Sequence, residues 1–237
     1  MKTCNLDLSS IPLNNDSLSQ PFKKNIDEYI GKINTQKFIK DLNIDKIYAY
    51  RENEEREFDI AYFLSKYRIE NFEWYASSIN IYDQLEFKSP NFLNSWTYYL
   101  PTEIELKWLW LFIGPAKSYT PLHIDTMNSG AWNLLLEGSK EWIFYSPNCS
   151  VSKELLPKDF KSHYKGEKKE ISFIQNAGDI VYTPSSWSHK VSNITPTISI
   201  TGNFINSINV NECINYLRCT QENNWYEIIK FLKSRLG

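Results

Sequence analysis

Apolar side chains occur in short runs along the second half of the chain, and turn-forming residues separate the runs. Residues 131–136 are mostly apolar and residues 140–145 are rich in aromatics, with Gly138 in the turn between them. Residues 197–204 alternate Thr, Ile, Ser, Ile and Thr, as is typical of a half-buried strand. The pattern predicts a mainly β fold with flanking helices, in which residues 131–145 form a hairpin.

Other strands follow from the same signals. Gly178 and Asp179 form a tight turn into a predicted strand at 180–183, which Pro184 ends, and a further strand begins at Trp187. The earlier part of the chain has both types of element: helices are predicted at 35–42 and 58–67, and strands at 47–51 and 72–80.

The two ends of the chain and one internal segment are not predicted to be strands. Residues 211–236 are predicted to be helical, because apolar residues recur there at steps of three and four. Their stripe, whose later members are Trp225, Ile228, Ile229 and Leu232, either packs on the barrel or forms a homodimer face. Residues 1–20 are expected to be a polar and possibly loose arm, and the charged residues 146–176 an insertion between barrel strands.

Composition narrows the class of protein. A chain of 237 residues is expected to form one main domain with a large core, and 15% aromatic residues suit a β-barrel interior. The net charge of −2 does not resemble that of a nucleic-acid-binding protein. The apolar run 108–113 is too short to span a bilayer, and the polar residues 1–19 lead us to expect no secretory signal. The cysteines lack Cys-x-x-Cys spacing, so we expect free thiols and a cytoplasmic location; they are Cys4, Cys149, Cys213 and Cys219.

The candidate chemistry rests on two of the three histidines. His123 and Asp125 are two residues apart, so a strand would place both side chains on one face. His189, from a distant strand, would complete two imidazoles and a carboxylate, the facial triad of non-haem Fe(II) oxygenases. Alone, His-x-Asp is a weak signal, and the alternative for His123 is a hydrogen-bonded core histidine. The third histidine, His163, is expected at the surface.

Residues 131–145 are mostly apolar, and they contain one cation, Lys140, and one amide, Asn133. Such a lysine usually extends to solvent, but if it points inward it needs an anionic partner. The joint pattern resembles the JmjC (Jumonji C) and cupin-like family of Fe(II)- and 2-oxoglutarate-dependent oxygenases, in particular its hydroxylase branch. The resemblance covers about residues 108–206 and rests on five spaced elements in order: Thr120-x-x-His123-x-Asp125, Asn133, Gly138-x-Lys140, Gly178-Asp179 with Pro184, and His189.

The resemblance implies a double-stranded β-helix, the cupin-like jelly roll, over residues 21–206, with a C-terminal helical element at 207–237. It implies Fe(II) ligation by His123, Asp125 and His189. It further implies that 2-oxoglutarate is bound by four residues: its distal carboxylate by Lys140 and Thr120, and its iron-side end by Asn133 and Asn203. Both asparagines could instead satisfy backbone groups, and Tyr75 is a weaker candidate contact that could equally be core.

The implied function is a dioxygenase that uses Fe(II), 2-oxoglutarate and O₂ to hydroxylate an unactivated C–H bond, first of all in a protein or peptide side chain. N-methyl-lysine demethylation and hydroxylation of a small molecule or amino acid are alternatives of the same class. A non-catalytic cupin-type metal- or ligand-binding protein is the alternative from a different class, and Lys140 with the intact triad argues against it. Thr126-Met127-Asn128 and Ser188 depart from the family pattern and are expected to line or adjoin the substrate mouth.

Overall fold

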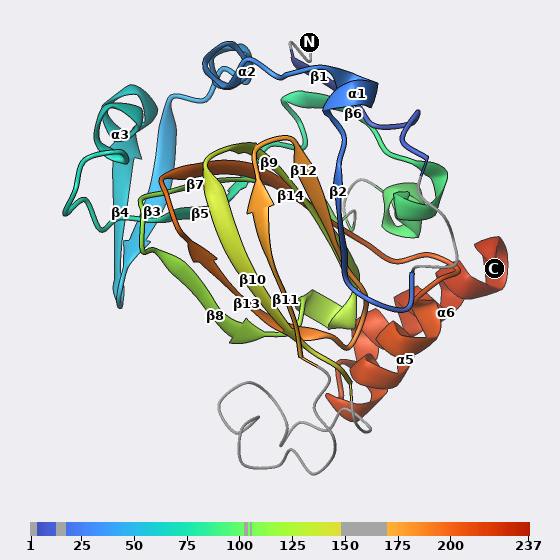
Figure 1. Cartoon of the computed structure of the whole chain (residues 1–237). Helices are drawn as coiled ribbons and strands as arrows, with labels where there is room; N and C mark the ends of the chain where they lie inside the picture. The colour runs from blue at the N-terminus through green and yellow to red at the C-terminus, as the bar shows by residue number, and fades with distance from the viewer. Residues whose placement is uncertain (1–3, 13–17, 102–103, 105, 148–169) are drawn as a thin grey trace.

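Two antiparallel sheets form a barrel at the centre of the molecule (Figure 1). A computed structural model describes residues 4–12, 18–101, 104, 106–147 and 170–237. The larger sheet has six strands in the order β2 (Phe22–Asn25), β12 (Asp179–Thr183), β9 (Gly130–Glu137), β14 (Thr197–Phe204), β7 (Leu109–Gly114) and β5 (Ala76–Asn80). The smaller has four, in the order β11 (Glu170–Asn176), β10 (Ser139–Tyr145), β13 (Ser188–Asn193) and β8 (Tyr119–His123).

The predicted jelly roll is confirmed, because strands that follow one another in sequence mostly belong to opposite sheets. The predicted hairpin of residues 131–145 is wrong: β9 pairs with β12 and β14, whereas β10 pairs with β11 and β13. Gly138, at φ +87°, turns the chain from one sheet to the other. A Cβ there would clash with the carbonyl oxygen of Pro196, so only glycine fits this crossing.

Burial follows the position of each strand. β9 and β12 are buried along nearly their whole length, because the barrel covers one face and the N-terminal segments cover the other. β10 instead alternates, and Lys140, Trp142 and Phe144 are its buried positions. The apolar runs of β9 and β12 thus match strands covered on both faces, and the alternation of β10 matches a strand with one face in solvent.

The N-terminal segments pack on the six-stranded sheet. β1 (Cys4–Asp7) pairs in parallel with β6 (Leu85–Lys88), and Leu6 and Leu8 are buried. The first residues described are therefore part of the core, which corrects the expectation of a loose arm. The remaining elements are α1 (Asp27–Ile30), α2 (Thr35–Asp41), β3 (Lys46–Arg51), β4 (Glu54–Asp59), α3 (Ile60–Lys66), η2 (Asn91–Leu93) and η3 (Trp96–Tyr99).

Helices and strands in this part begin close to their predicted positions. The Asn34 side chain caps α2 by accepting from the Lys37 amide. The Asp59 side chain caps α3 in the same way, so that helix begins at Ile60, and Phe58 belongs to β4. The strand predicted at 72–80 is shorter than expected and corresponds to β5, which begins at Ala76.

The C-terminal segment is two helices, not one. α5 (Val210–Cys219) and α6 (Asn223–Leu236) are separated at Gln221, whose φ is +59°. Ile229 and Leu232 are 0% and 3% exposed, in a cluster with Trp108 of the barrel. These two residues of the stripe therefore pack within their own chain, and a homodimer through this segment stays a prediction.

Part of the expected insertion is a barrel strand. Residues 170–176 form β11, whose seven residues pair with β10 in unbroken register. Cys149 and His163 lie outside the described residues. Cys4, Cys213 and Cys219 are free thiols. In the part of the chain that is described, no helix is long and apolar enough to cross a membrane.

Candidate metal centre and co-substrate cavity

The three predicted metal ligands meet at one end of the four-stranded sheet. β8 and β13 are neighbours, and their register places His123 directly opposite His189. Asp125 follows the end of β8 and points to the same place: its Oδ2 lies 4.0 Å from Nε2 of His189. One donor atom from each of the three residues lies within 4.8 Å of the others. This spacing fits one metal ion bound on a single face.

Hydrogen bonds orient both imidazoles toward the same point. Nδ1 of His123 lies 2.8 Å from the carbonyl oxygen of Pro121, and Nδ1 of His189 lies 3.1 Å from that of Trp187. These carbonyls hold the proton on each Nδ1, so each Nε2 is left as the metal donor. Oδ2 of Asp125 is buried and has no hydrogen-bond partner among the described residues, as an atom reserved for a cation would be.

Burial keeps the His189 imidazole in its neutral form. Desolvation, helped by the neighbouring His123, lowers the pKa of His189 to about 4. The imidazole is therefore neutral at physiological pH, and a neutral imidazole is the form that ligates metals.

Lys140 is a buried cation in the same cavity. Its side chain points inward from β10, and the residue is 2% exposed. Desolvation lowers its pKa to about 7, and no carboxylate among the described residues forms an ion pair with it. Its Nζ lies 5.9 Å from the centroid of the Phe112 ring. A buried ammonium in this setting is a binding site for an anion.

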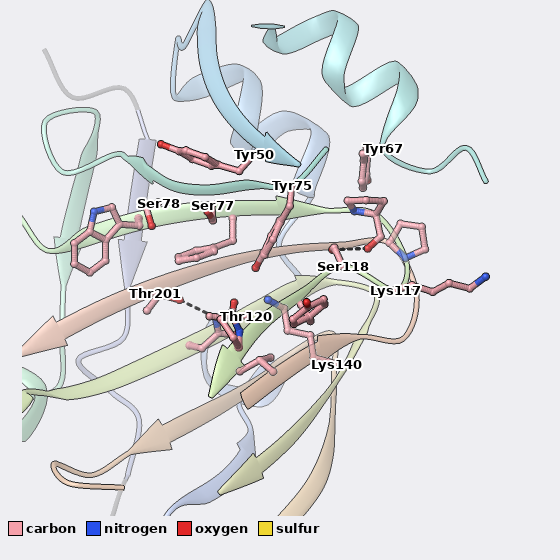
Figure 2. Close-up of a pocket in the computed structure, with 18 of the residues that line it drawn as sticks. Tyr50, Tyr67, Tyr75, Ser77, Ser78, Lys117, Ser118, Thr120, Lys140 and Thr201 are labelled. Atoms are coloured by element: carbon pink, nitrogen blue, oxygen red, sulfur yellow. Dashed lines mark hydrogen bonds between the residues drawn. The ribbon is translucent and has the colours of Figure 1, made fainter. Parts of the chain in front are cut away.

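Hydroxyl groups surround the space in front of Lys140 (Figure 2). Tyr75 extends toward Thr120 (Figure 2). Burial raises the pKa of its hydroxyl to about 12, against a lowering by the nearby Thr120 and Asn193 side chains. Asn193 lies opposite Lys140 in the pairing of β10 with β13, and its Nδ2 donates to Ser118 Oγ at 2.7 Å. Thr120 and Tyr75 therefore both lie beside Lys140, and Asn193 is a contact that the sequence did not indicate.

The two predicted asparagines line the cavity from the opposite sheet. Nδ2 of Asn133 donates to Thr201 Oγ1 at 2.7 Å and to Ser199 Oγ at 3.2 Å. Its Oδ1 accepts from Nε2 of Gln175 at 3.1 Å, and Nδ2 of Asn203 donates to Ser129 Oγ at 2.9 Å. Hydrogen bonds to neighbouring side chains thus hold both amides in place.

A single cavity of about 1290 Å³ contains the triad, Lys140 and the residues around it. It lies between the two sheets, and Trp108, Trp110 and Phe112 line its wall. The volume exceeds that of a small dicarboxylate and leaves room for part of a second molecule beside the metal site.

Most of the residues that depart from the family pattern are buried and do not line the cavity. Thr126 is exposed and lines the cavity, but Met127 and Asn128 are 8% and 2% exposed and are turned into the protein. Ser188 is 2% exposed, and its Oγ has no partner among the described residues. Met127, Asn128 and Ser188 are therefore buried residues rather than parts of the substrate mouth.

A family model described as "JmjC domain, hydroxylase" matches residues 110–172 and 150–204, a span that includes all three ligands and Lys140. This span of the chain is therefore similar to a JmjC domain of the hydroxylase type. The JmjC domain is a cupin-like jelly roll, in agreement with the two sheets described above.

Several curated proteins are similar to this part of the chain. The 2-oxoglutarate and iron-dependent oxygenase JMJD4 of Danio rerio is 30% identical over 145 residues, which cover 55% of this chain and 34% of that protein. The arginine-specific demethylase JMJ22 of Arabidopsis thaliana is 32% identical over 126 residues, 46% of this chain and 25% of the relative. The bifunctional arginine demethylase and lysyl-hydroxylase psr-1 of Caenorhabditis elegans is 30% identical over 122 residues, 40% and 29% of the two chains. The matched part spans about a third or less of each relative's length.

Proposed function

We propose that this protein is an Fe(II)- and 2-oxoglutarate-dependent oxygenase that hydroxylates a C–H bond of an acceptor bound in the cavity. The observation that carries the proposal is the presence, in one cavity, of a two-histidine, one-carboxylate ligand set and a buried lysine for which the described residues provide no anionic partner. The first arrangement suits a metal with open coordination positions, and the second suits a carboxylate.

Each residue would have a separate task. His123, Asp125 and His189 would hold Fe(II), which supplies the activation of oxygen when it is bound. Lys140 would pair with the distal carboxylate of 2-oxoglutarate, while the Thr120 and Tyr75 hydroxyls donate to the same group. Asn133 and Asn203 would shape the opposite wall. Trp110 and Phe112 would limit the entry of water beside the reacting centre.

The acceptor that we favour is a side chain of a protein or peptide. The relatives named above include an arginine demethylase and a protein named for both arginine demethylation and lysyl hydroxylation. Exposed apolar side chains at the cavity's edge, Tyr50, Ile69 and Tyr119, offer a surface to a macromolecule. Demethylation of an N-methyl group is the second candidate, because hydroxylation of the methyl carbon begins the same way.

Succinate formation tests the proposal directly. Purified protein with Fe(II), ascorbate and 2-oxoglutarate should release succinate, faster with its acceptor, and N-oxalylglycine should inhibit the reaction. His189→Ala and Lys140→Ala should abolish or strongly reduce turnover. Lys190→Ala is the matched control, because Lys190 is an exposed lysine next to His189 on the same strand. Tight binding of N-oxalylglycine with no succinate from any peptide or small-molecule pool would instead indicate a non-catalytic binding protein.

A further inference from the structure

The loops beside two of the metal ligands contain left-handed backbone at residues other than glycine. Met127 and Asn128, which follow Asp125, have φ of +53° and +55°. Ser186, which precedes His189, has φ of +67°. Such conformations are unfavourable for residues with a Cβ and persist only where the surroundings enforce them. Contacts with the rest of the protein must therefore hold these loops in this conformation.

Asn128 and Ser186 form a reciprocal pair of hydrogen bonds. Nδ2 of Asn128 donates to Ser186 Oγ at 2.9 Å, and the Ser186 amide donates to Asn128 Oδ1 at 2.6 Å. Asn128 is 2% exposed, so water cannot easily replace these bonds. Asn128 lies three residues after Asp125, and Ser186 lies three residues before His189. The pair thus joins the two loops at equal distances along the chain from the two ligands.

The Asn128 side of the pair is itself fixed to the protein. The Asn128 amide donates to the carbonyl of Asp125 at 2.9 Å, within η4 (Thr126–Asn128). The buried Cys213 thiol of α5 contacts the carbonyl oxygen of Asn128 at 3.5 Å. Met127 packs into the cluster of the C-terminal helices with Val210. Movement of Asp125 relative to His189 would have to break these contacts.

We infer that Asn128 and Ser186 are positioning residues that fix the separation of Asp125 and His189, and so set the affinity of the metal site. The inference rests on the proposed metal site and adds to it a specific pair of supporting residues. Partners that orient metal ligands commonly change metal affinity 10- to 100-fold when they are removed. A purely structural pair would change stability and leave metal affinity unchanged.

Glycine substitutions separate these two roles, because glycine tolerates left-handed backbone and relieves strain. Mn²⁺ binding to the full chain would be measured from the EPR signal of the free ion, together with thermal unfolding of the metal-free protein. Asn128→Gly removes both hydrogen bonds and should weaken Mn²⁺ about 10- to 100-fold. Ser186→Gly keeps the amide and removes one bond, and should weaken Mn²⁺ roughly 3- to 10-fold. The double variant should be no weaker than Asn128→Gly, since both changes remove the same contacts.

Two further variants complete the test. Asn43→Gly replaces an exposed left-handed asparagine, at φ +51°, far from the ligands in sequence, and should leave Mn²⁺ affinity unchanged. His189→Ala should abolish specific binding. Wild-type affinity in Asn128→Gly and Ser186→Gly, or strictly additive losses in the double variant, would overturn the positioning role alone. Equal, weak binding by wild type and His189→Ala would overturn the metal site and the inference with it.

Discussion

Binding of 2-oxoglutarate should weaken as the pH rises above 7, and Lys140 should be the cause. Burial lowers the pKa of Lys140 to about 7 in the absence of a ligand. Both carboxylates of 2-oxoglutarate are ionised throughout this range, and only the protonated lysine forms a charge-assisted pair with one of them. Above pH 7, binding must therefore be accompanied by uptake of a proton.

The magnitude follows from the two pKa values of the lysine. A bound carboxylate favours the charged form and raises the pKa of Lys140 toward its usual range. If that bound value is about 10 or higher, the affinity falls about 50-fold between pH 7 and pH 9. Burial and the neighbouring imidazole of His123 lower the pKa of His189 to about 4, and burial raises the pKa of Tyr75 to about 12, so neither changes charge in this interval.

The same pKa determines how the ligand-free protein responds to pH. The pKa of Lys140 is lower in the folded chain than in the unfolded chain, so between pH 7 and about 10 the unfolded state binds more protons. The free energy of unfolding therefore gains a contribution from Lys140 as the pH rises through this range. A control variant without an ionisable group at position 140 should lack this contribution.

Calorimetry on protein saturated with Mn²⁺ would measure both affinity and proton uptake. Titration with 2-oxoglutarate at pH 7, 8 and 9, in two buffers of different ionisation enthalpy, should show nearly one proton taken up at pH 8 and above. Lys140→Arg keeps its charge throughout, so its affinity should be weaker but almost independent of pH. An affinity of the wild-type protein that is equally flat, with no proton uptake, would refute the reasoning.

Three other perturbations test separate parts of the structure. His189→Ala should weaken Mn²⁺ more than about 100-fold, a larger effect than removal of a supporting residue, while circular dichroism shows an intact fold. Ile229→Glu places a charge in the core and should lower the free energy of unfolding by about 4 kcal/mol or more; a soluble, fully folded monomer in light scattering would contradict the packing of α6. Gly138→Ala should cost more than about 1 kcal/mol in denaturant unfolding, because of its φ of +87° and the nearby Pro196 carbonyl.

Local patterns predicted most strands of the barrel but not their assignment to sheets. The alternation at 197–204 corresponds to β14 from its first residue to its last, and the turn at Gly178-Asp179 leads into β12 as predicted. The prediction that this strand is half-buried is wrong, because β14 lies between β9 and β7 and its polar residues, Thr197 and Ser199 among them, are buried as well. A turn such as Glu137-Gly138-Ser139 looks the same whether it reverses the chain within a sheet or carries it to the other one. β11 was missed because a charged segment precedes it, although Ile171 and Phe173 alternate with polar residues in its sequence.

Part of the candidate site could likewise be predicted from local sequence patterns, and part depends on how distant segments pack. His123 and Asp125 could be recognised from their spacing, and His189 from the family pattern, and the structure brings all three together. Their roles stay predictions. The contact of Tyr75 with Thr120 could not be derived, because it depends on the pairing of β5 with β7 and on the fold of the two sheets around the cavity.

A buried polar network links the co-substrate wall to the metal ligands. Gln175, at 0% exposure, donates to the side chain and the carbonyl of Asn133 and to the carbonyl of Asp179, and accepts from Trp142 Nε1 at 2.8 Å. The Trp142 ring in turn stacks on the His189 imidazole, with centroids 5.7 Å apart. Every hydrogen-bonding atom of the Gln175 side chain is used, so the network favours one arrangement of the two sheets. These hydrogen bonds among protein groups therefore hold the two walls of the cavity together.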